Sequence, residues 1–264
     1  MKRNIVLPNF FTALCLCCGL FVIFKMNMIS PGTAVFDQVL SSVKILLIAA
    51  GFDVLDGAIA RAMNVKSKFG AFFDSMADAV SFGVAPSVLV LKTLSIMPGT
   101  VLSAFVTVGA MLYSVAGILR LVRFSLIAVG PSANLGPFRG LPVTCAGFAA
   151  ISPTLLLMKD TFSVSEHVHA LIAGGVFFIL GYLMLSNWRF PSIKRLNLTV
   201  TSIGLLALIV SLFSLLLYIA FHNFPAVLLL VSWGYVVFSL ALACIRLAQG
   251  KRSSALDESD EVVS

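Results

Sequence analysis

The sequence has little charge. Only 11% of its 264 residues are Asp, Glu, Lys or Arg, whereas soluble globular domains contain about 25% charged residues. Hydrophobic residues make up 59% of the chain, and the mean hydropathy is +1.06. This composition excludes an ordinary soluble domain and indicates that lipid is the natural solvent of the chain.

Histidine and cysteine are also scarce, which limits the metals that the chain can bind. There are three His and five Cys, and the cysteines lie inside apolar stretches. Cys15 and Cys18 have the spacing of a metal-binding pair, but no second Cys or His pair stands nearby. The formal net charge of +7 comes from Lys and Arg scattered between apolar stretches, so we expect no nucleic-acid partner.

Apolar stretches separated by Pro, Gly or charged residues predict an all-α integral membrane protein, a bundle of about eight transmembrane helices. The amino-terminal stretch is too long for a signal peptide and is not followed by a cleavage site, so we interpret it as the first helix. The expected spans lie near residues 7–28, 40–62, 71–95, 100–126, 141–158, 168–187, 198–220 and 225–247.

The distribution of positive charge predicts the topology. If the amino terminus is cytoplasmic, all Lys and Arg fall at inner ends except Lys25, Lys44, Lys92 and Lys159, as the positive-inside rule requires. An even number of spans then places the carboxyl terminus in the cytoplasm too. We expect one catalytic domain over residues 1–250 and a polar, acidic, disordered tail over residues 251–264.

Acidic residues are concentrated in one place. Four of the eleven Asp and Glu are Asp53, Asp56, Asp74 and Asp78. They fall where the second and third spans meet, at the cytoplasmic membrane interface. Asp53 and Asp56 are three residues apart and Asp74 and Asp78 are four apart, so each pair projects from one helix face. Two facing pairs would form a cage of four carboxylates.

Such a cage needs positive charge, because four Asp in membrane helices would cost on the order of 10 kcal/mol. Oxygen ligands favour Mg²⁺, Mn²⁺ or Ca²⁺, and two divalent ions would balance the four charges. Two other interpretations remain open: the acids pair with Arg61, Lys66 and Lys68, or they line a transport path for ions or protons. Transport would favour charges at several depths and an internal repeat, neither of which is evident.

The stretch from Asp56 to Asp78 resembles the signature of the CDP-alcohol phosphotransferase family, D-G-x2-A-R-x8-G-x3-D-x3-D. The match includes every specified position, and Asp53 precedes it as the usual additional acid. The matching residues are Asp56, Gly57, Ala60, Arg61, Gly70, Asp74 and Asp78.

Within that family, several stretches resemble the membrane-spanning phosphatidylserine synthases. They are LPNFFT, FGAFFDSMADAVSFGVAP, LRLVRF, GLP and SNWRFPS, from about residue 6 to residue 195. Ser125 departs from the pattern, since Asn commonly follows the Arg-Phe pair. The resemblance implies that the phosphatidyl group passes from CDP-diacylglycerol to L-serine in the bilayer, with release of CMP. It also implies a homodimer and a bacterial inner membrane location.

The resemblance assigns roles to the motif residues. Asp53, Asp56, Asp74 and Asp78 would bind two Mg²⁺ or Mn²⁺ ions, and Asp78 would also act as the general base. His167, His169 and His222 fall on the opposite membrane side in the expected topology, which favours a carboxylate base. CDP-diacylglycerol would contact Gly57, Ala60, Arg61, Gly70, Asn9 and Thr12, although helix capping is an equal alternative for Asn9 and Thr12.

The acceptor is less well specified. Arg120, Arg123 and Arg139 stand at inner helix ends, where one of them could bind the carboxylate of serine, and where basic membrane anchors are also usual. The same three residues could form a basic pocket for glycerol 3-phosphate or inositol phosphate. Serine as the acceptor therefore rests on the resemblance.

Overall fold

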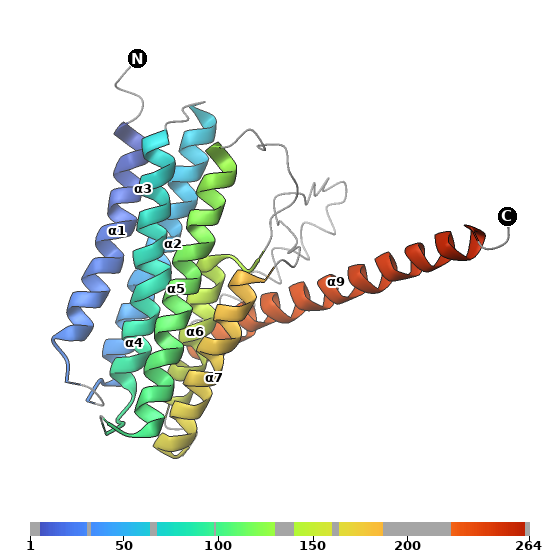
Figure 1. Ribbon diagram of the computed structural model, residues 1–264. Helices are drawn as coiled ribbons and strands as arrows, with labels where there is room; N and C mark the ends of the chain where they lie inside the picture. The colour runs from blue at the N-terminus through green and yellow to red at the C-terminus, as the bar shows by residue number, and fades with distance from the viewer. Residues whose placement is uncertain are drawn as a thin grey trace, which may run out of the picture.

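In the computed structural model, the described residues are 6–30, 33–63, 68–97, 99–129, 140–159, 164–186 and 223–261, and over these ranges all regular structure is helical. Figure 1 shows a bundle of long helices, with the last helix running obliquely away from the others. The described elements are α1 (Val6–Asn27), α2 (Phe36–Ala62), α3 (Lys68–Asp78), the π-helical turn η2 (Ala79–Val84), α4 (Ala85–Thr93), α5 (Val101–Val129), α6 (Val143–Leu157), α7 (Glu166–Leu185) and α9 (Phe224–Glu261).

Five described segments are long and apolar enough to cross a membrane, which agrees with the predicted integral membrane bundle. Six of the predicted spans start and end within a few residues of the observed helical segments, and α9 extends well beyond the predicted eighth span. The predicted span 198–220 lies outside the described residues, so a total of eight spans stays a prediction. The five segments are Asn9–Asn27, Phe69–Thr93, Val101–Arg123, Glu166–Leu185 and Phe224–Ala243.

Helix α9 continues to Glu261 and therefore includes most of residues 251–264, for which the sequence predicts disorder. The division of the chain at residue 250 into a catalytic domain and a tail stays a prediction.

Helix α1 approaches the π-helical turn η2 closely at a glycine. Ser81, which is fully buried, donates a hydrogen bond from its hydroxyl to the carbonyl oxygen of Cys15 at 3.0 Å. A Cβ atom built on Gly19, one helical turn further along α1, would stand 2.8 Å from the Ser81 Cα. Because backbone atoms cannot move aside cheaply, only glycine permits this approach.

Replacement of Gly19 by Ala is expected to destabilise the bundle by roughly 1–3 kcal/mol, as overpacking of a well-packed core does. The measurement is thermal unfolding in detergent, with Gly175→Ala as the matched control, since a Cβ on Gly175 would meet nothing within 4 Å. Equal melting temperatures for the two variants would contradict the close approach of α1 to η2.

The π-helical turn η2 separates α3 from α4 within one continuous helical segment, and it begins directly after Asp78. The backbone N–H of Ala85 donates to the Val80 carbonyl five residues earlier, which is the π-helical pattern. Pro86 has no N–H and so cannot bond the carbonyl of Phe82, four residues before it. The sequence at Pro86 therefore favours a local departure from the α-helix.

Helix α5 donates two side-chain hydrogen bonds to carbonyl oxygens of the turn. The Tyr113 hydroxyl donates to the Phe82 carbonyl at 2.8 Å, and the Ser114 hydroxyl donates to the Gly83 carbonyl at 3.0 Å. Tyr113 is fully buried. Neighbouring side chains often satisfy the backbone groups that a proline frees in a membrane helix. Tyr113 and Ser114 thus stabilise the turn that follows Asp78.

Replacement of Tyr113 by Phe is expected to cost about 1–3 kcal/mol of stability, because it leaves the buried Phe82 carbonyl without this donor. We also expect lower activity, since the turn orients Asp78. Thermal unfolding measures the first effect, and the CMP release that the sequence resemblance implies would measure the second. Tyr182→Phe is the matched control because Tyr182 is 66% exposed. Identical behaviour of the two variants would show that Tyr113 has no such role.

Candidate active site

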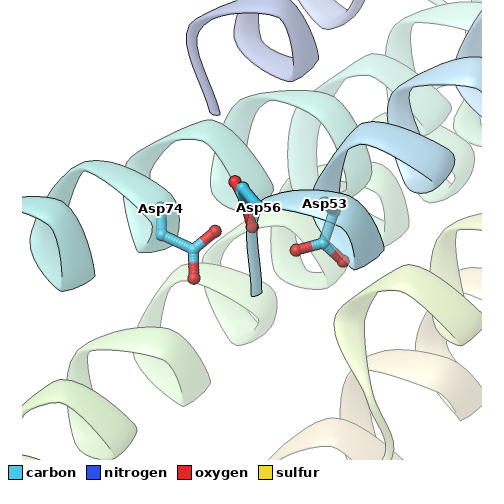
Figure 2. Close-up of side chains that lie close together, drawn as sticks. All are labelled: Asp53, Asp56 and Asp74. Carbon is cyan, nitrogen blue, oxygen red and sulfur yellow. The ribbon is translucent and has the colours of Figure 1, made fainter. Parts of the chain in front are cut away.

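Helices α2 and α3 bring three carboxylates together. Asp53 and Asp56 lie near the end of α2, and Asp74 lies on α3. One carboxylate oxygen from each of the three residues lies within 4.8 Å of the others. Figure 2 shows Asp74 facing Asp56 and Asp53 across the gap between the two helices. The two acidic pairs were predicted to converge, and in the structure three of their four residues do so.

Asp56 is the most enclosed member of this cluster. It is 5% exposed, whereas Asp53 and Asp74 are partly exposed. The Thr12 hydroxyl of α1 donates to Asp56 Oδ2 at 2.6 Å, and Thr12 is itself buried. A short hydrogen bond of this kind holds one carboxylate oxygen in place. Helix α1 thus contacts an acidic residue of the motif directly, and the predicted contact of Thr12 with CDP-diacylglycerol stays a prediction.

Asp78 lies one helical turn beyond Asp74 and is not a member of the group of three. It interacts electrostatically with Asp53, Asp74 and Asp56, and also with Arg120 on α5. Its Oδ1 atom is buried and has no hydrogen-bond partner among the residues that the structure describes. Buried carboxylate oxygens are nearly always paired, so this atom indicates a ligand.

The three clustered acids fit a divalent cation. At a separation of 4.8 Å, two ionised carboxylates repel each other by roughly 3 kcal/mol at an effective dielectric constant of about 20. A cation bound between them would replace this repulsion with attraction. The donors are all carboxylate oxygens, which Mg²⁺ and Mn²⁺ prefer. The residues present therefore match the predicted type of metal.

The other predicted residues around the motif divide into two groups. Gly57 and Ala60 on α2, Gly70 on α3 and Asn9 on α1 are all partly buried and lie on the helices that carry the acids. The side chain of Arg61 lies outside the described part of the structure, so its predicted role stays a prediction.

The structure distinguishes two of the three arginines proposed for the acceptor. Arg120 is buried, with 9% of its surface exposed, and it interacts electrostatically with Asp78. Arg123, one turn further along α5, is exposed. Arg139 lies outside the described residues. Arg120 thus stands in the field of an acid of the motif.

His167 and His169 lie in the first turn of α7. Figure 1 shows that α7 begins at the end of the bundle opposite to the end where α2 leads into α3. This placement agrees with the expectation that neither histidine serves the acidic site.

For some residues near the site, the sequence alone does not indicate a role. Tyr113 and Ser114 on α5 are far from the motif along the chain, and they belong to apolar stretches. The one available indication was Pro86, eight residues after Asp78, because a proline inside a predicted span frees a backbone carbonyl.

The fold and the site define an integral membrane helical bundle whose clustered carboxylates could bind a metal ion. The family model for CDP-alcohol phosphatidyltransferase matches residues 5–245, and the chain belongs to this family. Its reaction is therefore the phosphatidyl transfer that is typical of this family in phospholipid synthesis. The alternative interpretation, in which the acids line a transport path for ions or protons, is set aside.

Curated relatives are similar over most of the chain. A protein of Helicobacter pylori named CDP-diacylglycerol–serine O-phosphatidyltransferase is 32% identical over 190 residues, which covers 72% of this chain and 73% of the relative. Proteins with the same name are 31% identical in Bacillus subtilis, over 67% of this chain and 85% of the relative, and 29% identical in Methanocaldococcus jannaschii, over 62% and 71%.

Proposed function

We propose that the chain transfers the phosphatidyl group of CDP-diacylglycerol to the hydroxyl of L-serine, giving phosphatidylserine and CMP. The observation that carries this proposal is the cluster of Asp53, Asp56 and Asp74, together with a buried oxygen of Asp78 that has no hydrogen-bond partner in the described part of the chain. The names of the relatives support serine as the acceptor.

Asp53, Asp56, Asp74 and Asp78 would hold the divalent metal, Mg²⁺ or Mn²⁺, as two ions. When bound, the metal neutralises the diphosphate and the charge that develops on departing CMP. Thr12 keeps Asp56 oriented for this task through its hydrogen bond. These acids are at the same time close enough to one another to need such a cation.

Asp78 is the proposed general base. The serine hydroxyl oxygen forms a bond to the phosphorus of the phosphatidyl group, and the bond from that phosphorus to the CMP oxygen breaks. The hydroxyl proton passes to the Asp78 carboxylate, and CMP leaves with the electron pair of the broken bond. The Asp78 oxygen, which is buried and accepts no hydrogen bond from the residues that the structure describes, is suited to accept this proton.

CDP-diacylglycerol would lie with its acyl chains in the bilayer and its head group over α1, α2 and α3. The small residues Gly57, Ala60 and Gly70 leave room for the cytidine, and Asn9 borders the same space from α1. Arg61 would bind diphosphate oxygens. These assignments rest on the motif.

We assign the acceptor carboxylate to Arg120, because it is buried and interacts with Asp78. Arg123 and Arg139 remain candidates for a second contact. The site would face the cytoplasm, with eight spans and both termini on that side, in a bacterial inner membrane. We also propose that the protein is a homodimer.

The test of the acceptor is product analysis. Purified protein is incubated with CDP-diacylglycerol, Mg²⁺ or Mn²⁺, and equal concentrations of serine, glycerol 3-phosphate and inositol phosphate, and the lipid products are identified by mass spectrometry. Phosphatidylserine as the main product supports the proposal. A phosphorylated lipid product from either competitor would keep the reaction class and overturn serine.

A further inference from the structure

Two serine hydroxyls join α3 to α5 beside the acidic cluster. The Ser75 Oγ on α3 and the Ser125 Oγ on α5 lie 3.1 Å apart, and either of them can be the donor. Ser75 directly follows Asp74, one of the three clustered acids, and both serines are partly buried. Hydrogen bonds between side chains hold neighbouring membrane helices together. This contact therefore ties the helix that carries Asp74 to α5.

Each of the two hydroxyls also reaches a carbonyl oxygen of its own helix, four residues earlier. The Ser75 Oγ lies 3.0 Å from the Ala71 carbonyl oxygen, and the Ser125 Oγ lies 3.0 Å from that of Leu121, as is usual for serines inside helices. A hydroxyl has one proton to donate and can also accept. One hydroxyl therefore donates to its own helix while the other donates across to it. In either arrangement one hydrogen bond joins α3 to α5.

Asp78 lies between two places at which α5 contacts its helical segment. Three residues before Asp78, Ser75 contacts Ser125, and four and five residues after it, α5 donates the two hydrogen bonds to the π-helical turn. Figure 1 shows α5 running alongside this segment. On α5, Arg120 lies between the same two places, five residues before Ser125. The two contacts thus hold α5 and the segment that carries Asp78 together on both sides of these residues.

We propose that Ser75 and Ser125 are positioning residues for the transfer reaction. Their hydrogen bond holds α3 against α5, which keeps Asp74 in the acidic cluster and Asp78 aligned with the substrate. The inference rests on the proposed function, since it concerns the geometry of the same site. Functional groups need positions accurate to about 0.5 Å, which hydrogen bonds from the surrounding residues provide. Neither serine is a specified position of the acidic motif.

The test begins with Ser75→Ala and Ser125→Ala, which each remove the link between the helices. In each variant the remaining hydroxyl still has a carbonyl oxygen of its own helix as acceptor. The melting temperature should therefore change little, because no donor is left without a partner. We expect kcat for CMP release to fall about tenfold, less than the hundredfold loss that a displacement of about 1 Å can cause. The KM for CDP-diacylglycerol should stay near the wild-type value.

Further variants test whether the two serines act as one link. Because either substitution alone breaks the link, the double alanine variant should lose about as much kcat as each single variant. Ser125→Thr keeps a hydroxyl and should retain turnover, whereas Ser125→Val has the same branched shape without it and should behave like Ser125→Ala. Unchanged kcat in the alanine variants, losses that multiply in the double variant, or equal kcat in the Thr and Val variants would overturn the proposal.

Ser152 and Ser232 provide a matched control pair. Their hydroxyl oxygens also lie 3.1 Å apart and join two helices, α6 and α9, and each also reaches a carbonyl oxygen of its own helix. Neither of these helices carries an acid of the motif. Ser152→Ala and Ser232→Ala should keep the wild-type kcat. A tenfold loss in this pair too would mean that turnover responds to any such contact between helices, and Ser75 and Ser125 would have no special role.

Metal binding separates this proposal from the proposed function. Electron paramagnetic resonance measures Mn²⁺ binding by the purified protein without lipid substrate or acceptor. We expect the Kd for Mn²⁺ to rise about tenfold in Ser75→Ala and Ser125→Ala, the lower end of the loss usual when a residue that orients a metal ligand is removed, and to stay unchanged in the control pair. If the wild type uses another acceptor, the proposed function fails and this measurement still applies. An unchanged Kd in both variants contradicts the positioning of Asp74, whatever the acceptor is.

Discussion

Replacement of Asp78 by Asn is expected to reduce CMP release from CDP-diacylglycerol and serine by about 10²–10⁴-fold, the range usual for loss of a general base. The amide has nearly the same shape as the carboxylate, but it cannot accept the serine proton. Asp78 has this role in our account because it belongs to the motif and its Oδ1 is buried without a hydrogen-bond partner among the described residues.

Asp37→Asn is the matched control for this variant, because Asp37 is exposed in the first turn of α2, far from the clustered acids. It should retain wild-type turnover. Binding of CDP-diacylglycerol, followed by equilibrium dialysis, should be weakened far less than turnover in Asp78→Asn. If Asp78→Asn retained more than about a tenth of the wild-type rate, which is less than the loss expected for a general base, the assignment of the base would be wrong.

Removal of divalent metal is expected to abolish turnover and to lower the melting temperature. A ligand at about 100 times its Kd stabilises a protein by about 2.7 kcal/mol, which corresponds to roughly 5 °C or more for a chain of this length. The physical reason is the repulsion among Asp53, Asp56 and Asp74, whose oxygens lie within 4.8 Å of one another. Addition of Mg²⁺ or Mn²⁺ after chelation should restore both properties.

Asp74→Asn separates this metal effect from other effects of chelation. It removes one charge from the cluster, so the melting temperature of the metal-free protein should rise relative to the wild type, and the increase on adding Mg²⁺ should shrink. Glu166→Gln, at the exposed start of α7, serves as the control. A melting temperature that does not respond to divalent metal in the wild type would contradict metal binding by these acids.

Much of the site could be predicted from the sequence because its determinants are local. The spacing of Asp53 and Asp56, and of Asp74 and Asp78, fixes which helix face each pair occupies. Because only a few residues join the end of α2 to the start of α3, the acidic residues on either side of this junction must lie close together. Long apolar stretches likewise fixed most helix boundaries to within a few residues, because the bilayer sets their length.

What could not be predicted depends on contacts between distant segments. The π-helical turn after Asp78 depends on Tyr113 and Ser114, which bond its carbonyl oxygens from another helix. The position of Asp78, outside the group of three acids, follows from the orientation of α3 against α2. Spacing along the chain contains none of this information.

The central claim is that the clustered aspartates catalyse metal-dependent transfer of a phosphatidyl group from CDP-diacylglycerol. The most direct measurement is CMP release by the purified protein, with CDP-diacylglycerol and serine supplied together and separately, in Mg²⁺ and after chelation. We expect CMP only when serine and metal are both present, in amounts equal to the phosphatidylserine formed. No CMP under any of these conditions, from protein with an intact thermal unfolding transition, would contradict the account.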